Sequence, residues 1–169
     1  MVIPLYTDCP GCGARLPVAE DSLYGRYNAS PACWRLYGEL NAYTLTRGDR
    51  ESAFSHQLQV DAYGAQHVAA DARPIGAVFA LIGLYLACER GYTGRQIQHL
   101  HALLAHRSKT WPRFTPPSRA GDVTILNVMQ APPGEERDAT LRQWGQSVWQ
   151  AWSHEHERVR SLFETVMAE

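Results

Sequence analysis

The sequence predicts a mainly α-helical protein, a single-domain bundle of about five helices with an irregular, metal-binding N-terminal arm. Apolar residues recur at intervals of three and four along several segments, and capping residues or prolines precede these segments. Residues 1–28 are instead rich in proline, glycine and tyrosine and show no helical period. Because 169 residues can bury one substantial core without disulfides, we expect one domain over residues 1–169.

The arm contains the sequence CPGCG at residues 9–13. Its proline and glycines favour a tight turn that directs the sulfurs of Cys9 and Cys12 to the same side. This spacing is typical of half a zinc site, and one short hairpin is expected from Ala14 to Val18. A redox motif would need a preceding strand and a following amphipathic helix, and neither is visible in the sequence. Two surface thiols without a metal are the other alternative.

The first expected helix begins at Pro31, with Ser30 as its N-cap, and ends at Gly48. Cys33 therefore lies in the first helical turn, where unpaired N–H groups and the helix dipole favour a thiolate. A metal-ligating or reactive thiol and a small core cysteine are equally compatible with this position. A zinc ribbon would need a second cysteine pair, so further ligands must come from elsewhere in the chain.

The second expected helix begins at Asp49 and carries the sequence SHQLQVDAYGAQHV, residues 55–68. His56 and His67 share a helix face, but they are separated by roughly 16 Å along the axis. Ligands at about 2.0–2.1 Å from one ion cannot span that distance. Either the helix begins after His56, or only one of the two histidines is a ligand and the other is a neighbouring or core histidine.

Three other polar residues of this stretch are candidates for chemistry. Asp61 lies away from the histidine face and either meets another element or orients a histidine by accepting its second ring N–H. In a metalloenzyme, Asp61 would act as the base and Tyr63 would donate a hydrogen bond to developing charge. In a structural site, Asp61, Tyr63 and Gln66 would form a buried hydrogen-bond network.

The rest of the chain predicts further helices separated by one irregular loop. An apolar helix that includes Cys88 as a core residue is expected between Pro74 and Gly91. Three more segments follow: a helix from Thr93 through His106, a loop over residues 108–117, and the short helix ILNVMQ, capped by Thr124. The longest helix is expected from Glu135 to Met167.

Five more histidines lie in these helices, and one of them, His154, points away from the apolar face of its helix and is expected to be exposed. His156 falls on the apolar face of the last helix and is either a hydrogen-bonded core histidine or an imidazole for a metal between helices. His99, His101 and His106 fall on varied faces of their helix. We expect these three to be exposed or at helix ends.

The composition excludes several classes of partner. With 16 basic and 17 acidic residues the formal net charge is -1, which favours neither nucleic acid nor an anionic membrane. The N-terminus lacks a secretory pattern, and the apolar run from Ile75 to Cys88 is too short to span a bilayer. We therefore expect a soluble, cytoplasmic protein, in which a C-x-x-C pair indicates metal or redox use rather than a disulfide framework.

The motifs CPGCG, SPACW, HQLQVDAYGAQH, LACERG, TWPRF, VTILNV and VWQAWSHEH, in this order, resemble an uncharacterised bacterial family known only as a domain of unknown function. The resemblance spans nearly the whole chain and brings no activity with it. It implies that the positions of the family's two signatures belong to one constellation. These signatures are Cys-x-Gly-Cys and His-x4-Asp-Ala-Tyr-x2-Gln-His, here Cys9, Gly11, Cys12, His56, Asp61, Ala62, Tyr63, Gln66 and His67.

Two functions are compatible with these candidates. The first is a zinc-dependent enzyme of hydrolytic type, in which Cys9, Cys12 and one or two of Cys33, His56 and His67 leave a position open for water. The second is a helical binding or adaptor protein in which four protein ligands close a structural zinc clip that holds the arm on the bundle. A nucleic-acid-binding zinc module fits poorly because lysine is scarce and no basic face is visible.

Overall fold

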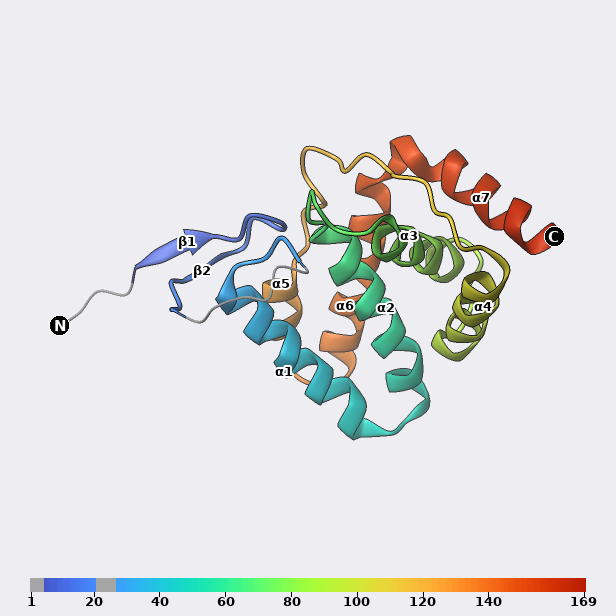
Figure 1. Cartoon of the computed structure of the whole chain (residues 1–169). Helices are drawn as coiled ribbons and strands as arrows, with labels where there is room; N and C mark the ends of the chain where they lie inside the picture. The colour runs from blue at the N-terminus through green and yellow to red at the C-terminus, as the bar shows by residue number, and fades with distance from the viewer. Residues whose placement is uncertain (1–4, 21–26) are drawn as a thin grey trace.

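A computed structural model of the chain describes residues 5–20 and 27–169. It confirms the predicted mainly α-helical fold, with one small antiparallel hairpin at the N-terminal end (Figure 1). The elements of the described residues are β1 (Tyr6–Asp8), β2 (Arg15–Pro17), α1 (Pro31–Arg47), α2 (Arg50–Gln66), α3 (Pro74–Cys88), α4 (Gly94–Arg107), α5 (Ile125–Gln130), α6 (Glu135–Ala151), the 3-10 turn η1 (Ser153–Glu155) and α7 (His156–Ala168).

Helix α2 is at the centre of the bundle and packs against α1, α3, α4 and α6. The core around it is built from fully buried aromatic and aliphatic side chains, including Tyr63, Trp144 and Trp152. Helix α3 is buried along most of its length, as its all-round apolar sequence predicts. Within the described residues, no helix has the length and apolar character needed to cross a membrane.

The helix starts predicted at Ser30 and Thr93 are confirmed in their capping chemistry. The Ser30 hydroxyl accepts a hydrogen bond from the Cys33 backbone N–H at 3.3 Å, and Pro31 occupies the first turn of α1. Gly48 ends that helix with a φ of 65°, a left-handed conformation that glycine adopts without a steric penalty. Thr93 and Gln96 form a reciprocal capping box at the start of α4.

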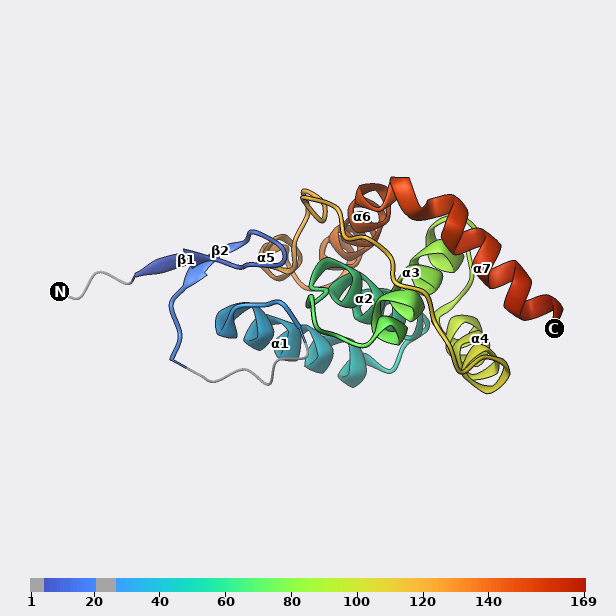
Figure 2. The same ribbon diagram turned by 45° about the horizontal axis from the view of Figure 1, so that its top comes forward.

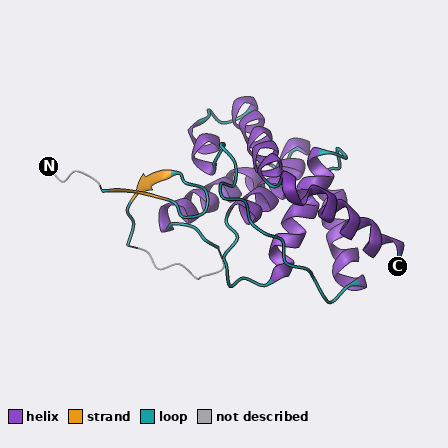
Figure 3. Cartoon of the chain, turned by 90° about the horizontal axis from the view of Figure 1, so that it is seen from above, coloured by secondary structure: helices purple, strands orange, loops and turns teal. Residues whose placement is uncertain are grey.

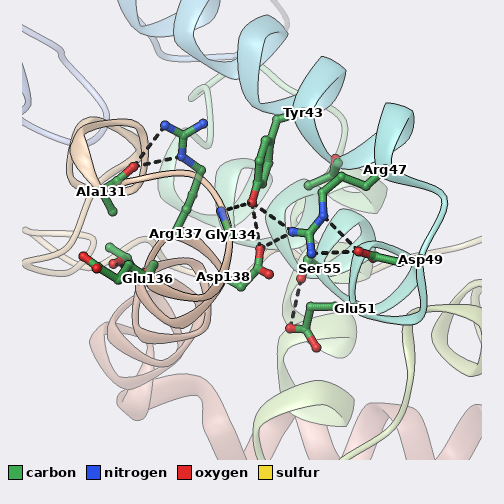
Figure 4. A network of polar contacts seen from close by, with 12 residues as sticks. Tyr43, Arg47, Asp49, Glu51, Ser55, Ala131, Gly134, Glu136, Arg137 and Asp138 are labelled. Atoms are coloured by element: carbon green, nitrogen blue, oxygen red, sulfur yellow. Dashed lines mark hydrogen bonds and ion pairs between the residues drawn. The ribbon is translucent and has the colours of Figure 1, made fainter.

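A partly buried polar network joins α1 to the N-terminal turn of α6 (Figure 4). The carboxylate of Asp138 is buried and accepts hydrogen bonds from Arg47 at 2.5 Å and from the Tyr43 hydroxyl at 3.3 Å. The backbone N–H of Gly134 in turn donates to the Tyr43 hydroxyl at 2.8 Å. These contacts connect the start of α6 to α1.

The single long helix expected from Glu135 to Met167 is wrong, because η1 divides it into α6 and α7. At the break, the backbone N–H of Trp152 bonds to the Trp149 carbonyl three residues earlier, which tightens the last turn. The break allows the buried Glu155 carboxylate to accept a hydrogen bond from the Thr115 backbone N–H at 2.9 Å. Thr115 lies in the long loop that connects the end of α4 to the start of α5 and runs across the bundle (Figure 3).

The hairpin lies at one end of the molecule and extends away from the helices (Figures 1 and 2). Its two strands pair antiparallel, with Tyr6 opposite Pro17 and Asp8 opposite Arg15. The turn between the strands lies against the bundle, near α1 and α5 (Figure 2). Parts of the predicted arm, residues 1–4 and 21–26, lie outside the described residues.

Candidate metal centre

Three thiols and one imidazole meet where the hairpin turn contacts the bundle. Cys9 and Cys12 come from the turn, Cys33 from the first turn of α1, and His67 directly follows the last residue of α2. One ligand atom from each residue lies within 4.8 Å of the ligand atoms of the other three. All four residues are buried, with Cys33 and His67 completely shielded from solvent.

The spacing of these atoms matches that of a tetrahedral ion site. With zinc–sulfur bonds of about 2.3 Å, tetrahedral geometry places two sulfurs roughly 3.8 Å apart. The Sγ atoms of Cys12 and Cys33 are 3.9 Å apart, and Nε2 of His67 is 3.3 Å from Sγ of Cys33. These two distances, and the 4.8 Å limit for all four donors, are compatible with one tetrahedral ion.

The backbone fixes which nitrogen of His67 faces the sulfurs. Nδ1 lies 2.9 Å from the carbonyl oxygen of Tyr63. Because a carbonyl can only accept a hydrogen bond, Nδ1 carries the proton and Nε2 presents its lone pair to the cluster. A metal-binding histidine commonly donates its second N–H to such an acceptor, which holds the ring in position.

Backbone hydrogen bonds shape the cysteine turn. The N–H of Cys9 donates to the Ala14 carbonyl, and the N–H of Gly13 donates to the Cys9 carbonyl, both at 2.8 Å. Gly13 has a φ of 74°, as expected for the glycine after the second cysteine. The N–H of Ser30 lies 3.4 Å from Sγ of Cys9, which is the type of contact that stabilises a thiolate.

The segment before α1 is joined directly to the segment that follows α2. The backbone N–H of Asn28 donates to the His67 carbonyl at 2.9 Å, and Tyr27 forms a bridge with Val68. Gly11 packs so closely here that a Cβ atom would lie 2.3 Å from the Asn28 carbonyl oxygen. The cysteine turn and the end of α2 are thus in contact at Gly11.

Residues 7–153 match a family of unknown function, DUF5946. The chain belongs to this family. The segment matched to DUF5946 contains all four residues of the cluster and the helices that position them. No curated protein and no solved structure matches the chain.

The thiols of this DUF5946 protein have strongly unequal acidities. Hydrogen bonds to Cys12 and Cys33 lower the pKa of the Cys9 thiol far below its usual value. Hydrogen bonds with Cys12 and Cys9, together with burial, raise the pKa of the Cys33 thiol far above its usual value. Without a cation, one sulfur holds the negative charge while a neighbour keeps its proton. A bound cation would favour the thiolate form of all three.

An aromatic stack covers the cluster on the side of α2. The Tyr63 ring stacks on the His67 ring and on the Tyr37 ring, with centroids 4.0 Å apart in both cases. The Tyr63 hydroxyl donates toward Sγ of Cys33 at 3.7 Å. Burial, reinforced by the hydrogen bond to the Cys33 sulfur and by its electrostatic interaction with that sulfur, raises the pKa of Tyr63 far above its usual value, so the hydroxyl stays protonated.

The structure places His56 and Asp61 outside this cluster. Helix α2 is continuous from Arg50 to Gln66, and Nδ1 of His56 lies 3.0 Å from the Thr44 hydroxyl. Asp61 is buried against α3, where a Cβ on Gly83 would lie 1.9 Å from its carboxylate. The Gln57 side-chain amide donates to both Asp61 oxygens, at 3.0 and 3.1 Å.

Gln66, His156 and Cys88 lie apart from the cluster as well. The Gln66 side chain accepts a hydrogen bond from the Trp144 indole at 2.8 Å, away from the sulfurs. His156 stacks on Trp149 and donates from Nε2 to the Trp149 carbonyl at 2.8 Å, which is the hydrogen-bonded alternative considered above. Cys88 is half-buried, and burial raises the pKa of its thiol to about 12.

Two polar residues that the sequence did not single out line a pocket beside the cluster. Gln57 is one of them. It lies four residues before Asp61 on the same helix, and this spacing was the available sequence signal for their contact. His101 is the other, and the expectation that it is exposed or at a helix end is wrong. It is half-buried because α4 turns this face toward Phe79 of α3, on which the His101 ring stacks at 5.0 Å.

Proposed function

We propose that this protein binds one zinc ion through Cys9, Cys12, Cys33 and His67, and that the ion holds the N-terminal hairpin on the helical bundle. The observation that carries this proposal is the convergence of four buried donors, three sulfurs and one correctly oriented nitrogen, within 4.8 Å of one another. The donors come from three separate segments of the chain. A shared ion would therefore link them and contribute directly to the free energy of folding.

The donor set favours zinc over other common metal ions. Thiolates select soft or borderline cations, whereas calcium and magnesium require oxygen ligands. Cys₃His is one of the usual ligand sets of structural zinc sites, which are four-coordinate and tetrahedral. The short C-x-x-C turn followed by distant ligands is compatible with such a centre.

A closed, structural site is favoured over a hydrolytic one. Catalytic zinc sites commonly keep three protein ligands and leave the fourth position for water, whereas four side chains are available here. Tyr63, predicted above as a catalytic donor, is directed at a sulfur, and Asp61, predicted as the base, bonds to Gln57. We propose that Tyr63 supports the ligand Cys33 and that Asp61 belongs to a separate site. A cytoplasmic location fits this proposal, because a reducing compartment keeps the three thiols available to a metal.

Metal analysis of the purified chain by inductively coupled plasma mass spectrometry tests the ligand set. We expect about one equivalent of zinc in the wild type, in line with a single four-ligand site. Cys9→Ser and His67→Ala should lose most of it, since each removes one of the four donors. His56→Ala is the matched control, because this second histidine of the same stretch bonds to Thr44 and should leave the zinc content unchanged. Full retention in Cys9→Ser, or loss in His56→Ala but not in His67→Ala, would contradict the proposal.

A further inference from the structure

A pocket of about 630 Å³ opens between α2, α3 and the facing side of α4. Most of its wall is apolar, with Val60, Ile75 and Ala80 among the residues that form it. Phe79 and Tyr27 add aromatic surface. A concave, mainly apolar cavity of this size with a few polar groups is the usual form of a site for a small organic molecule.

Two of the polar side chains that line this pocket, those of Asp61 and His101, carry hydrogen-bond acceptors. The buried carboxyl of Asp61 receives hydrogen bonds from Gln57 alone among the described residues, and no described cation forms an ion pair with it. Burial raises the pKa of Asp61, because a buried negative charge without a neighbouring cation is unfavourable. Asp61 is thus an acceptor that lacks a compensating positive charge.

His101 provides a second acceptor. Its Nε2 is shielded from solvent and has no hydrogen-bond partner among the described residues. A hydrogen bond to the Phe79 backbone involves the imidazole, and it must therefore use the other nitrogen, Nδ1, as donor. Burial lowers the pKa of His101 to about 4, so the ring is neutral near pH 7 and Nε2 carries a lone pair.

Two acceptors in an apolar cavity specify the chemistry of the missing partner. A buried carboxylate is stabilised most by a cation that also donates hydrogen bonds, and an ammonium group has three donors and no acceptor. Aromatic faces such as that of Phe79 attract the same group. The one strongly basic residue among the described pocket residues, Arg73, is exposed and makes no described ion pair with Asp61.

We propose that this pocket binds a small molecule that carries a protonated amine on an apolar body, with Asp61 as the counter-ion and His101 as a second acceptor. The site is distinct from the metal centre, although His67 contributes to both. A small molecule can occupy the pocket without reaching the zinc ion. The bundle would then be a binding module, and the ion would hold its N-terminal hairpin in place.

Benzylamine and benzyl alcohol are suitable probes because they have nearly the same shape and differ in charge at pH 7. We would titrate each into the zinc-loaded full chain and follow backbone amide shifts by two-dimensional NMR. Benzylamine should bind at least about tenfold more tightly than the alcohol, a difference of about 1.4 kcal/mol. The shifts should concentrate on the α2 and α3 residues that line the pocket.

Asp61→Asn keeps the size of the side chain and should reduce the preference for benzylamine to within about twofold. Asp71→Asn removes a similar but exposed charge near the end of α2 and should leave the preference unchanged. Equal binding of the two probes by the wild type, or binding of neither, would overturn the proposal without reference to any variant. So would a preference that persists in Asp61→Asn or disappears in Asp71→Asn.

Discussion

At Gly11 the proposed metal centre is packed so closely that there is no room for a methyl group. A Cβ at this position would lie 2.3 Å from the Asn28 carbonyl oxygen and 2.5 Å from Cδ2 of His67. The first contact is with backbone, which cannot rotate away, and the second is with a metal ligand of our proposal. Any larger residue must therefore push the cysteine turn away from His67.

We predict that Gly11→Ala destabilises the folded protein by about 1–3 kcal/mol, the usual cost of inserting a methyl group into a packed site. It should also weaken zinc binding, because the turn and His67 move apart. Chemical denaturation and competition with a zinc chelator measure the two effects. Gly38→Ala is the matched control: it lies in an exposed part of α1 with no atom within 4 Å of the new Cβ. There we expect a stabilisation of about 0.5–1 kcal/mol. Equal effects of the two substitutions would contradict the proposed packing.

Asp61 makes the stability of the protein depend on pH. In the unfolded chain its pKa is about 3.9. In the folded protein burial raises this pKa, and the hydrogen bonds from Gln57 only partly oppose the shift. Below about pH 4 both states are protonated and the group has no effect. As the pH rises above that value the unfolded state ionises more readily, so the folded state loses stability.

Asp61→Asn should remove this loss. We predict that the free energy of unfolding of the variant, relative to the wild type, increases between pH 5 and pH 8. Urea denaturation of both proteins at each pH measures the difference, and the effect of pH on the metal ligands is common to both and cancels. A relative stability that is constant over this range, or that falls, would show that the carboxyl is not held in a desolvated site.

The sequence named all four residues of the proposed metal site among its candidates, together with His56. Cys9, Cys12 and Cys33 were recognisable because a C-x-x-C turn and a helix N-terminus are local features. Helical geometry showed that His56 and His67 could not share one ion in a continuous helix, but it could not choose between them. The choice depends on the contact between Asn28 and the end of α2, which is a tertiary contact without a sequence signature.

At the scale of elements, Gln66 links three segments that are distant in sequence. Its side-chain N–H group donates to the carbonyls of Ala120 and Val123, at 2.9 and 3.0 Å, and its oxygen accepts from the buried Trp144 indole. Helix α2, helix α6 and the loop before α5 are therefore joined by one amide. The hydrogen-bonding capacity of this buried side chain is largely used.

We predict that Gln66→Leu destabilises the protein by at least about 2 kcal/mol, since a single buried polar group left without a partner costs about 1–3 kcal/mol. Thermal or urea denaturation provides the measurement. Gln98→Leu, on the exposed face of α4, is a chemically identical control and should change stability by less than about 0.5 kcal/mol. If the two variants are equally stable, the amide does not join these segments.

The boundaries of most helices followed from local chemistry, whereas the break before α7 did not. Ser30, Pro31, Gly48 and Thr93 mark helix ends through their own backbone and side-chain preferences. Between residues 146 and 169 the sequence contains neither glycine nor proline. The apolar spacing also continues across η1, from buried Trp152 to buried Val159. The break depends on hydrogen bonds to a distant loop, which periodicity cannot reveal.

For the whole molecule, the proposed ion explains why a hairpin that extends from the bundle has a defined position. An isolated two-stranded hairpin is at best marginally stable, and the three described residues of β1 are exposed. The buried residues at this end are Cys9 and Cys12 of the turn, Ala14 after it, and Leu16 of β2. Zinc would add to them a covalent-like connection between the hairpin, α1 and the end of α2.

X-ray absorption spectroscopy at the zinc edge of the zinc-loaded chain tests the proposed ligand set. We predict three sulfur neighbours at about 2.3 Å and one imidazole nitrogen at about 2.0–2.1 Å, with no water bound to the metal. A protein that takes up no zinc under reducing conditions would contradict it. A spectrum with two or fewer sulfurs, or with a bound water in place of the imidazole, would contradict it equally.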